Sequence, residues 1–425
     1  MTTRRELLQA GLLGAGSVAL RALATGVPAS FLLRPRAAWA EPSTTHRILI
    51  LVASDAGDPL NANCPGSYID GIAHPTGEDF LPADVMLGGR PFAGARAWTS
   101  LPADVLDRTC FMHHGTYTNA HGNHSKVMRL MGAVKRNEMM ISAFSKRLGP
   151  ELQSVQSEPV NLGAPLLSFD GRRLAKLSPR SVKARSRAPS DDLAKLEHLR
   201  DKEIDRLHAV LAADGTKEQR RLLDRFAQTR QEARDISQDL LDQLDAITSD
   251  GDGDQVRAAA VLAAMNVAPA FAVRVRFGSD NHTDLDLARE VQETTAGIGH
   301  LRSLFEILKD LDLQDRVVVA TLNVFGRTLA SKGTRGRDHN AHHHVMMVSG
   351  PGVRPGVVGG LQPKGKDFGS TGIDSVTGVG TDLGDVPYEQ TLESVGKTLG
   401  SLLGLQQAEL EEDIQGGKVL GVVRA

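Results

Sequence analysis

The chain has 425 residues and a formal net charge of −2, with 41% hydrophobic and 24% charged residues. This is the composition of a globular protein that is long enough for a large core, in one big α/β domain or two smaller ones. The near-neutral charge argues against a nucleic-acid binder, and only 4% of the residues are aromatic, which leaves little for base stacking. The composition therefore favours a protein that acts on a small molecule or on another protein.

The first forty residues have the pattern of an export signal. Residues 3–8 (TRRELL) resemble a twin-arginine signal, residues 11–20 (GLLGAGSVAL) are weakly hydrophobic, and residues 38–40 (AWA) fit a small-x-small cleavage site. An uncleaved amphipathic anchor is the alternative. We expect residues 1–40 to be a signal peptide, and residues 41–425 to work in the periplasm or outside the cell. No later segment has the apolar length of a transmembrane helix.

Cysteine usage is compatible with export. Cys64 and Cys110 are the only two cysteines, so that at most one disulfide can form. Two free buried thiols are the alternative, and the sequence leaves both states open.

Five segments are predicted to be strands because they are short, apolar and rich in β-branched residues. They are residues 47–53 (RILILVA), 106–113 (LDRTCFMH), 272–277 (AVRVRF), 316–322 (RVVVATL) and 345–349 (VMMVS). The first four run into polar loops, and the fifth follows a histidine-rich segment.

Helical patterns lie between these predicted strands. Residues 288–311 and 388–403 carry apolar side chains at helical spacing. Strands that alternate with helices imply right-handed βαβ units and a mainly parallel sheet, in which ligands bind beyond the carboxyl ends of the strands. We therefore expect an α/β fold with its site at that edge.

One segment differs from the rest of the chain. At about residues 187–250 the sequence is highly charged, periodic and almost free of glycine, which predicts a helical insertion in the α/β core. Residues 249–255 (SDGDGDQ) resemble a calcium loop without its terminal bidentate glutamate, and we interpret them as a solvated linker.

Four clusters at predicted strand ends contain the residue types that bind metals. They are Asp55 with Asp58, then His113, His114, His121 and His124, then Asp280 with His282, and finally Asp338 with His339, followed by His342, His343 and His344. For each histidine taken alone, a structural role is a better explanation than metal binding. Carboxylates and imidazoles from separate strand ends at one sheet edge, however, suit a one- or two-zinc hydrolytic site.

These motifs resemble the bacterial DUF1501 family of the alkaline phosphatase-like (sulfatase-like) superfamily, whose members are exported by the twin-arginine route. The resemblance rests on residues 58–65 (DPLNANCP), 278–282 (GSDNH), 323–328 (NVFGRT) and 336–340 (GRDHN), and more loosely on Asn123, His124 and Ser125. It leaves out the helical insertion. It implies a three-layer α/β/α sandwich with a mainly parallel sheet.

The resemblance also implies which residues bind the metal. The superfamily's metal positions fall on Asp58, Asp280, His282 and His339, with Asp338 adjacent, and they would hold one zinc or a similar divalent ion. Val324 stands where the family has a glutamate, and an aliphatic side chain cannot bind a metal. Asn323 offers only a weak amide ligand. This departure argues against a second metal.

The function implied by the resemblance is metal-dependent hydrolysis of a small anionic ester, a phosphate or a sulfate. His124, or a water on the metal, is the candidate for proton transfer. Ser125 is the nearest hydroxyl that could act as the nucleophile, and Thr116 lies in the same loop. Arg327 is the candidate for pairing with an ester oxygen. For Arg327, a salt bridge to neighbouring helices is the alternative.

A different class of function stays open. A catalytically degenerate member of the superfamily would be a periplasmic or surface binding protein, with the helical insertion as its contact to a protein partner. Val324 favours this alternative. A copper redox protein is disfavoured because no suitable Cys or Met residues accompany the histidines.

Overall fold

The structure is a computed structural model that describes residues 45–186, 206, 239–278, 280–330 and 335–425. The chain divides into two compact units, one of Met1–Thr44 with Pro179–Ser249 and one of Thr45–Ser178 with Asp250–Ala425. In the first unit, the described residues include helix α7 (Pro179–Ser186). The predicted signal peptide and most of the predicted helical insertion lie outside the described residues. The second unit holds the sheet and the sites considered below.

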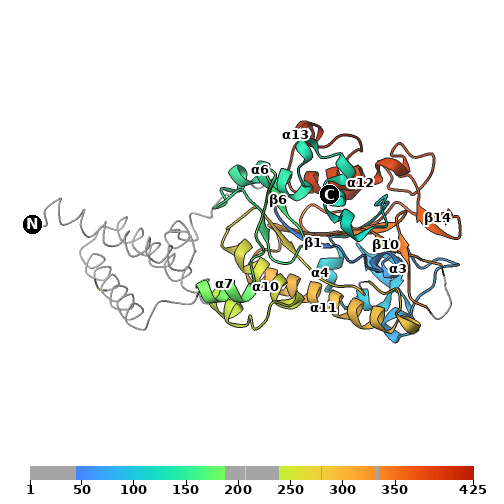
Figure 1. Cartoon of the computed structure of the whole chain (residues 1–425), viewed down its shortest axis with the longest axis horizontal. Coiled ribbons are helices and arrows are strands. Elements are labelled where there is room, and N and C mark those ends of the chain that lie inside the picture. The colour runs from blue at the N-terminus through green and yellow to red at the C-terminus, as the bar shows by residue number, and fades with distance from the viewer. Residues whose placement is uncertain (1–44, 187–205, 207–238, 279, 331–334) are drawn as a thin grey trace, which may run out of the picture. The chain divides into compact units, whose positions relative to one another are not determined.

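A central sheet of seven strands, counted over the described residues, forms the middle of the second unit (Figure 1). Its order is β13-β4-β12-β9-β1-β8-β5. The strands are β1 (Ile48–Ser54), β4 (Thr109–His114), β5 (Val160–Asn161), β8 (Ala270–Val273), β9 (Val317–Asn323), β12 (His344–Ser349) and β13 (Gly356–Val358). Only β12 runs antiparallel to its neighbours, β4 and β9. The fold is therefore mixed α/β with a mainly parallel sheet, as the sequence predicted.

All five predicted strands are present in the sheet. Every residue of β1 and of β9 is buried, as expected for apolar strands covered on both faces. The largest difference is at β8, which runs from Ala270 to Val273 and shares only residues 272 and 273 with the predicted strand at 272–277. It ends there because the backbone N–H of Arg274 donates to the side chain of Gln255.

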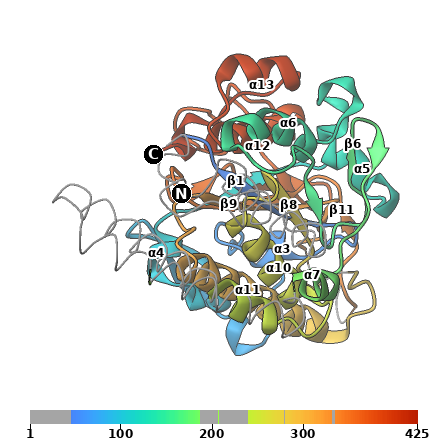
Figure 2. The ribbon, with the colours of Figure 1, turned by 90° about the vertical axis from the view of Figure 1, so that its left-hand side faces the viewer.

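Helices cover both faces of the sheet (Figure 2). Helices α10 (Asp252–Ala264) and α11 (Ala288–Asp310) lie on one face, and α6 (Met140–Leu152) and α12 (Thr391–Leu402) lie on the other. The predicted helices at residues 288–311 and 388–403 correspond to α11 and α12. Helix α11 buries Ile298, Leu301, Phe305 and Leu308, which recur at helical spacing.

Short elements complete the second unit. The short helices are α3 (Leu60–Asn63), α4 (Ala103–Leu106), α5 (His124–Met128) and α13 (Gln407–Asp413). The two-stranded pairs are β2 (Pro82–Leu87) with β3 (Arg90–Ala95), β6 (Ser168–Phe169) with β7 (Arg172–Arg173), β10 (Gly326–Arg327) with β11 (His339–Asn340), and β14 (Leu361–Lys364) with β15 (Asp367–Ser370). Among the helices of the described residues, none combines the length and the apolar character needed to cross a membrane.

The direction of β12 decides where the histidine-rich segment lies. His344, the first residue of β12, pairs with His114, the last residue of β4. Because β12 is antiparallel to the other strands, its beginning lies at their carboxyl ends. The histidines before β12 therefore meet the polar loops that follow β1, β4, β8 and β9.

The two cysteines are free thiols in the structure, and both are buried. Burial raises the pKa of Cys64 and of Cys110 to about 12, so that both stay protonated at neutral pH.

Candidate metal centre

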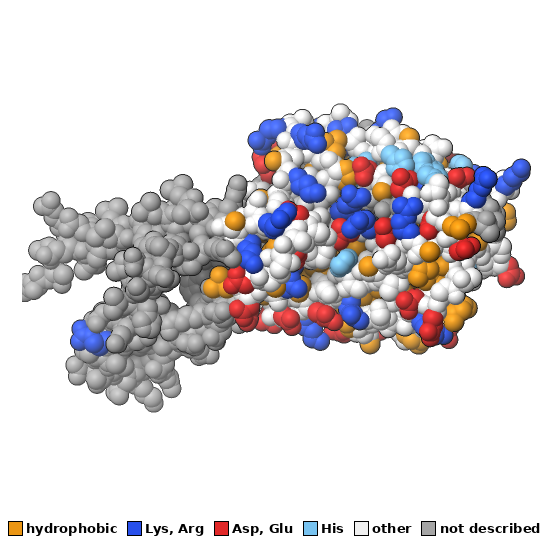
Figure 3. Space-filling view, turned by 60° about the horizontal axis from the view of Figure 1, so that its bottom comes forward, with side chains coloured by type: hydrophobic (Ala, Val, Ile, Leu, Met, Phe, Trp, Pro, Cys, Tyr) orange, Lys and Arg blue, Asp and Glu red, His pale blue; other side chains and the backbone are white. Residues whose placement is uncertain are grey.

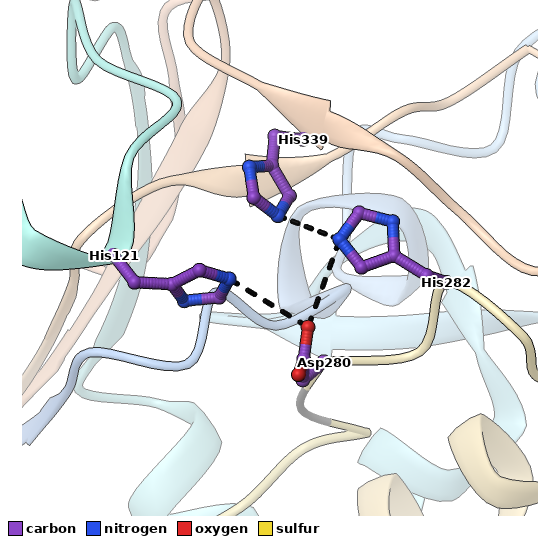
Figure 4. A group of neighbouring side chains, drawn as sticks. All are labelled: His121, Asp280, His282 and His339. Atoms are coloured by element: carbon purple, nitrogen blue, oxygen red, sulfur yellow. Dashed lines mark hydrogen bonds and ion pairs between the residues drawn. The ribbon is translucent and has the colours of Figure 1, made fainter.

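Four side chains from three separate segments meet at the carboxyl edge of the sheet (Figure 4). They are His121 from the turn after β4, Asp280 and His282 from the loop after β8, and His339 from β11. One ligand atom of each lies within 4.8 Å of the ligand atoms of the other three. The closest pair is Nε2 of His282 and Nε2 of His339, which are 2.7 Å apart.

The carboxylate stands beside two of the imidazoles. Oδ1 of Asp280 is 3.6 Å from Nε2 of His121 and 3.7 Å from Nε2 of His282. Asp280 has a backbone φ of +52°, a conformation that aspartate tolerates better than most other residues. This left-handed backbone is the kind of local strain that is often found at functional sites.

The other ring nitrogen of each histidine faces an oxygen. Nδ1 of His121 lies 2.7 Å from the carbonyl oxygen of Asp55, and Nδ1 of His339 contacts the carbonyl oxygen of Asn119. Nδ1 of His282 lies 3.3 Å from a carboxylate oxygen of Asp338. An oxygen of this kind can only accept, so each Nδ1 carries a proton, and in its neutral form each ring presents a lone pair at Nε2.

Three ring nitrogens and a carboxylate that face a common point form a group that suits a cation. Metal-binding histidines usually donate their second N–H to a carboxylate or a carbonyl, as all three histidines do here. Without a shared cation or proton, the Nε2 lone pairs of His282 and His339 would repel each other at 2.7 Å. The donor set of three imidazoles and one carboxylate fits a four-coordinate zinc ion.

The protonation states suit a metal ligand set. Burial alone would raise the pKa of Asp280, but the hydrogen bond and charge of Arg327, with smaller effects from His121 and His282, bring this pKa below its ordinary value. Burial lowers the pKa of His339 and outweighs its bond to Asn119. The carboxylate is therefore ionised and the His339 imidazole neutral at pH 7, as metal binding requires.

Arg327 lies fully buried behind the cluster. Its five N–H groups are directed at the carbonyl oxygens of Gly57, Ala56 and Arg337, at Oδ1 of Asp280, and at Nε2 of His282. A bound metal would take over the His282 lone pair from Arg327. In this structure Arg327 positions Asp280 and His282 with all its N–H groups engaged, and only the N–H directed at His282 would be released by a bound metal.

The buried carboxylate of Glu290 joins the two segments that carry the ligands. It accepts from Asn281, between Asp280 and His282, at 2.8 Å, and from the guanidinium of Arg337 at 2.7 Å. The backbone N–H of Arg337 donates back to the carbonyl of Asn281 at 3.1 Å. At Gly336, an added Cβ would lie 1.7 Å from that carbonyl oxygen, so that only glycine allows this approach.

The structure brings together three of the five metal positions implied by the resemblance. Asp280, His282 and His339 meet, whereas Asp338 is not in the cluster and accepts from Nδ1 of His282 at 3.3 Å. Asp58 belongs to a different buried group. Its carboxylate accepts from the N–H of Leu60 and from Asn323, and it lies 3.6 Å from Nε2 of His344.

His121 takes the remaining place in the cluster. The sequence showed it as one of four histidines that follow the second predicted strand, but nothing in their spacing distinguished it from His113, His114 or His124. The fold distinguishes them. His121 is partly exposed in the loop, whereas the other three are buried.

The predicted catalytic residues occupy different surroundings. His124 is buried on α5, with Nδ1 3.1 Å from the carbonyl of Ser54, and burial lowers its pKa. Ser125 follows it and is partly exposed. Thr116 is buried, and its hydroxyl has no hydrogen-bond partner in the described part of the chain. None of the three belongs to the four-residue cluster.

The positions of Asn323 and Val324 bear on a second metal. The Asn323 amide oxygen accepts from the N–H groups of Gly57 and Val324, and its amide nitrogen donates to Asp58. The Val324 side chain is fully buried. Asn323 is thus engaged inside the fold, and Val324 offers no ligand atom.

Two histidines of the 342–344 run, His343 and His342, have structural surroundings. His343 and His113 are fully buried, with Nε2 of His343 2.9 Å from Nδ1 of His113 and Asn61 3.2 Å from Nδ1 of His343. Nε2 of His113 lies 3.3 Å from the carbonyl of Pro65. A chain of donors therefore runs from Asn61 through both rings to this carbonyl. His342 lies nearer the surface against Tyr388.

Residues 168–377 match the family model described as "Protein of unknown function (DUF1501)". The matched range holds Asp280, His282 and His339 but not His121, and it also spans residues 187–250, which the motif resemblance left out. No curated protein matches the chain. The family description assigns no activity, so that function has to be argued from the geometry of the site.

Proposed function

We propose that the chain is an exported, one-metal hydrolase of phosphate or sulfate esters. The observation that carries the proposal is the convergence of three imidazole lone pairs and one ionised carboxylate, with each imidazole oriented by an oxygen acceptor. Imidazole and carboxylate ligands without thiolates suit zinc or a similar borderline divalent ion.

The chain's own residues would bind and orient the metal. His121, Asp280, His282 and His339 would be the ligands, and Asp338 would hold the ring of His282 in place. A bound zinc would supply a Lewis acid that polarises the ester and activates a water or hydroxyl nucleophile. The side chains of Asp280, His121 and His282 are 58%, 40% and 38% exposed, so that a substrate can approach from solvent.

The proposal extends to the superfamily and to the location of the protein. A mainly parallel sheet with helices on both faces and the match to DUF1501 support an alkaline phosphatase-like fold. The paired arginines at positions 4 and 5, ahead of a weakly hydrophobic run, support twin-arginine export to the periplasm or beyond.

A degenerate binding protein is the second candidate function. Two observations favour it: Val324 offers no ligand for a second metal, and Arg327 is saturated by protein acceptors. Such a protein would keep the metal but would not turn over an ester.

The test combines metal content with turnover. Residues 41–425, purified without a histidine tag, are analysed for metal and assayed on p-nitrophenyl phosphate and p-nitrophenyl sulfate with and without added zinc. His282→Ala is compared with His342→Ala, which removes a histidine outside the cluster. We expect about one equivalent of metal and metal-dependent hydrolysis, both lost only in His282→Ala.

Two other outcomes are informative. Metal binding without turnover of any ester would favour the binding protein. A wild-type protein that binds no zinc after reconstitution would overturn the proposal.

A further inference from the structure

A pocket of about 550 Å³ lies at the same edge of the sheet as the metal cluster. Three of its residues sit where strands end: Asn161 at the end of β5, Arg274 after β8, and Asp55 after β1. Two others, Arg173 and Lys176, come from β7 and the segment after it. A volume of this size is enough for a small organic ligand.

The pocket has an excess of positive charge. Arg173, Lys176 and Arg274 line it, against the single carboxylate of Asp55. Arg173 and Lys176 are exposed and form no ion pair in the described part of the chain. The preceding residue, Arg172, differs because it is paired with Glu158 and does not line the pocket. The free cations are thus gathered on the pocket side of this segment.

Two polar groups of the pocket lack hydrogen-bond partners among the residues that the structure describes. Nε of Arg274 is a buried donor that makes no hydrogen bond to the described residues. Oδ1 of Asn161, a residue that is 4% exposed, has no partner there either, but as an acceptor it suits a water or a hydroxyl group and not an anion. Unsatisfied buried polar groups are costly, so that they usually mark a place for a water or a ligand. Arg274 differs in this from Arg327, whose N–H groups all have hydrogen-bond partners within the protein.

The pocket adjoins the metal cluster through one residue. Asp55 lines the pocket, and its carbonyl oxygen accepts the hydrogen bond from Nδ1 of His121 at 2.7 Å. Lys and Arg side chains also gather on a face of the molecule that exposes histidines (Figure 3). Asp55 therefore connects the pocket to the His121 side of the metal cluster.

We propose that this pocket is a subsite for a second anionic group of the substrate. The preferred substrates are then esters that carry a further phosphate, sulfate or carboxylate group on the part that does not react. Cations in a partly enclosed site bind such groups by charge-assisted hydrogen bonds. This inference rests on the proposed function, but its first test does not depend on catalysis.

The first test measures anion binding to the metal-free protein. Inorganic pyrophosphate is titrated into chelator-treated residues 41–425 at low salt, because screening weakens exposed charge pairs. The variants are Arg173→Gln and Lys176→Gln, with Arg172→Gln as the matched control, which removes an equal charge one residue away. We expect each pocket variant to bind pyrophosphate about 5- to 10-fold more weakly and the control to bind within about 2-fold of wild type.

The second test links the pocket to the substrate. The zinc-loaded protein is assayed on phenyl phosphate and on 4-carboxyphenyl phosphate, which differ by one remote carboxylate. The KM for the carboxylated ester should be lower, and this advantage should shrink in Arg173→Gln while kcat stays unchanged. Equal KM values for the two esters in the wild type would overturn the proposal.

The outcomes separate the subsite from the proposed function. Pyrophosphate binding that falls in the pocket variants, in a protein that binds no zinc, would support the anion site and refute the hydrolase. The opposite outcome is also possible to recognise. Zinc-dependent turnover of the ester, together with equal pyrophosphate binding by Arg173→Gln and Arg172→Gln, would support the hydrolase and refute the anion site.

Discussion

Nε2 of His282 and Nε2 of His339 face each other at 2.7 Å, although the two residues are 57 positions apart in the chain. The other nitrogen of each ring, Nδ1, donates a hydrogen bond, in His282 to the carboxylate of Asp338 and in His339 to the carbonyl of Asn119. Two lone pairs are thereby brought together by the fold itself. The fold alone thus assembles the ligand atoms of the candidate metal centre.

The first prediction is that His121 is the fourth metal ligand. Because His121 and not Asp58 joins the cluster, His121→Ala should weaken zinc binding by more than about 100-fold. Asp58→Asn should change zinc affinity only a few-fold. Competition with a zinc chelator measures both affinities. The opposite order would show that Asp58 binds the metal in place of His121.

Asp338 should act on the metal through His282. Asp338→Asn keeps the size of the side chain but weakens the acceptor for Nδ1 of His282, so that zinc affinity should fall by about 10-fold, with one equivalent still bound at saturation. Asp310→Asn, at the exposed end of α11, is the control and should bind zinc as the wild type does. Loss of all zinc in Asp338→Asn would instead make Asp338 a direct ligand.

Glu290 should contribute more to the free energy of unfolding than the other carboxylates of α11. It is fully buried and accepts from Asn63, Asn281 and Arg337. Glu290→Gln leaves the Arg337 charge buried without its partner, and it should lower the free energy of unfolding by about 3–5 kcal/mol. Chemical denaturation of the metal-free protein measures this loss.

The matched control for Glu290 lies on the same helix. Glu306 is 57% exposed and is paired with Arg302 one turn away, so that Glu306→Gln should cost no more than about 1 kcal/mol. Similar losses in the two variants would show that the buried network is not what holds the ligand loops.

Mild acid should destabilise the fold through its buried histidines. Burial lowers the pKa of His113 to about 4 and places the pKa of His343 well below its ordinary value of 6.5. The unfolded chain takes up these protons below about pH 6.5, whereas in the folded chain His113 does so only near pH 4 and His343 only well below pH 6.5. The stabilisation is therefore complete above pH 6.5 and is lost as the pH falls towards 4, by about 1.4 kcal/mol per histidine and pH unit.

Unfolding of the metal-free protein at pH 7.5, 6.5 and 5.5 tests this acid sensitivity. The free energy of unfolding should change little over the first step and fall over the second. In His113→Leu the second fall should be smaller, although the variant is less stable at every pH because Pro65 and His343 lose a partner. A profile that stays flat down to pH 5.5 would contradict the prediction.

Local sequence pattern was enough to predict the main elements. Uninterrupted apolar runs with β-branched residues identify β1 and β9, and apolar side chains at helical spacing identify α11, because burial on both faces or on one stripe imposes those patterns. Alternation of the elements was enough for a mainly parallel sheet. The sequence motifs also singled out Asp280, His282 and His339, which do meet.

Only the tertiary structure decided which side chains share a point in space. It made β12 antiparallel and buried His113 and His343. It also placed His121 in the metal cluster, paired Asp58 with Asn323, and gave the N–H groups of Arg327 their hydrogen-bond acceptors. Each of these depends on contacts between residues far apart in the chain, such as the 57 positions between His282 and His339. Residue type and spacing predict which face of a single helix or strand is buried. Which ligand residues lie close together depends instead on how loops from different elements pack against one another.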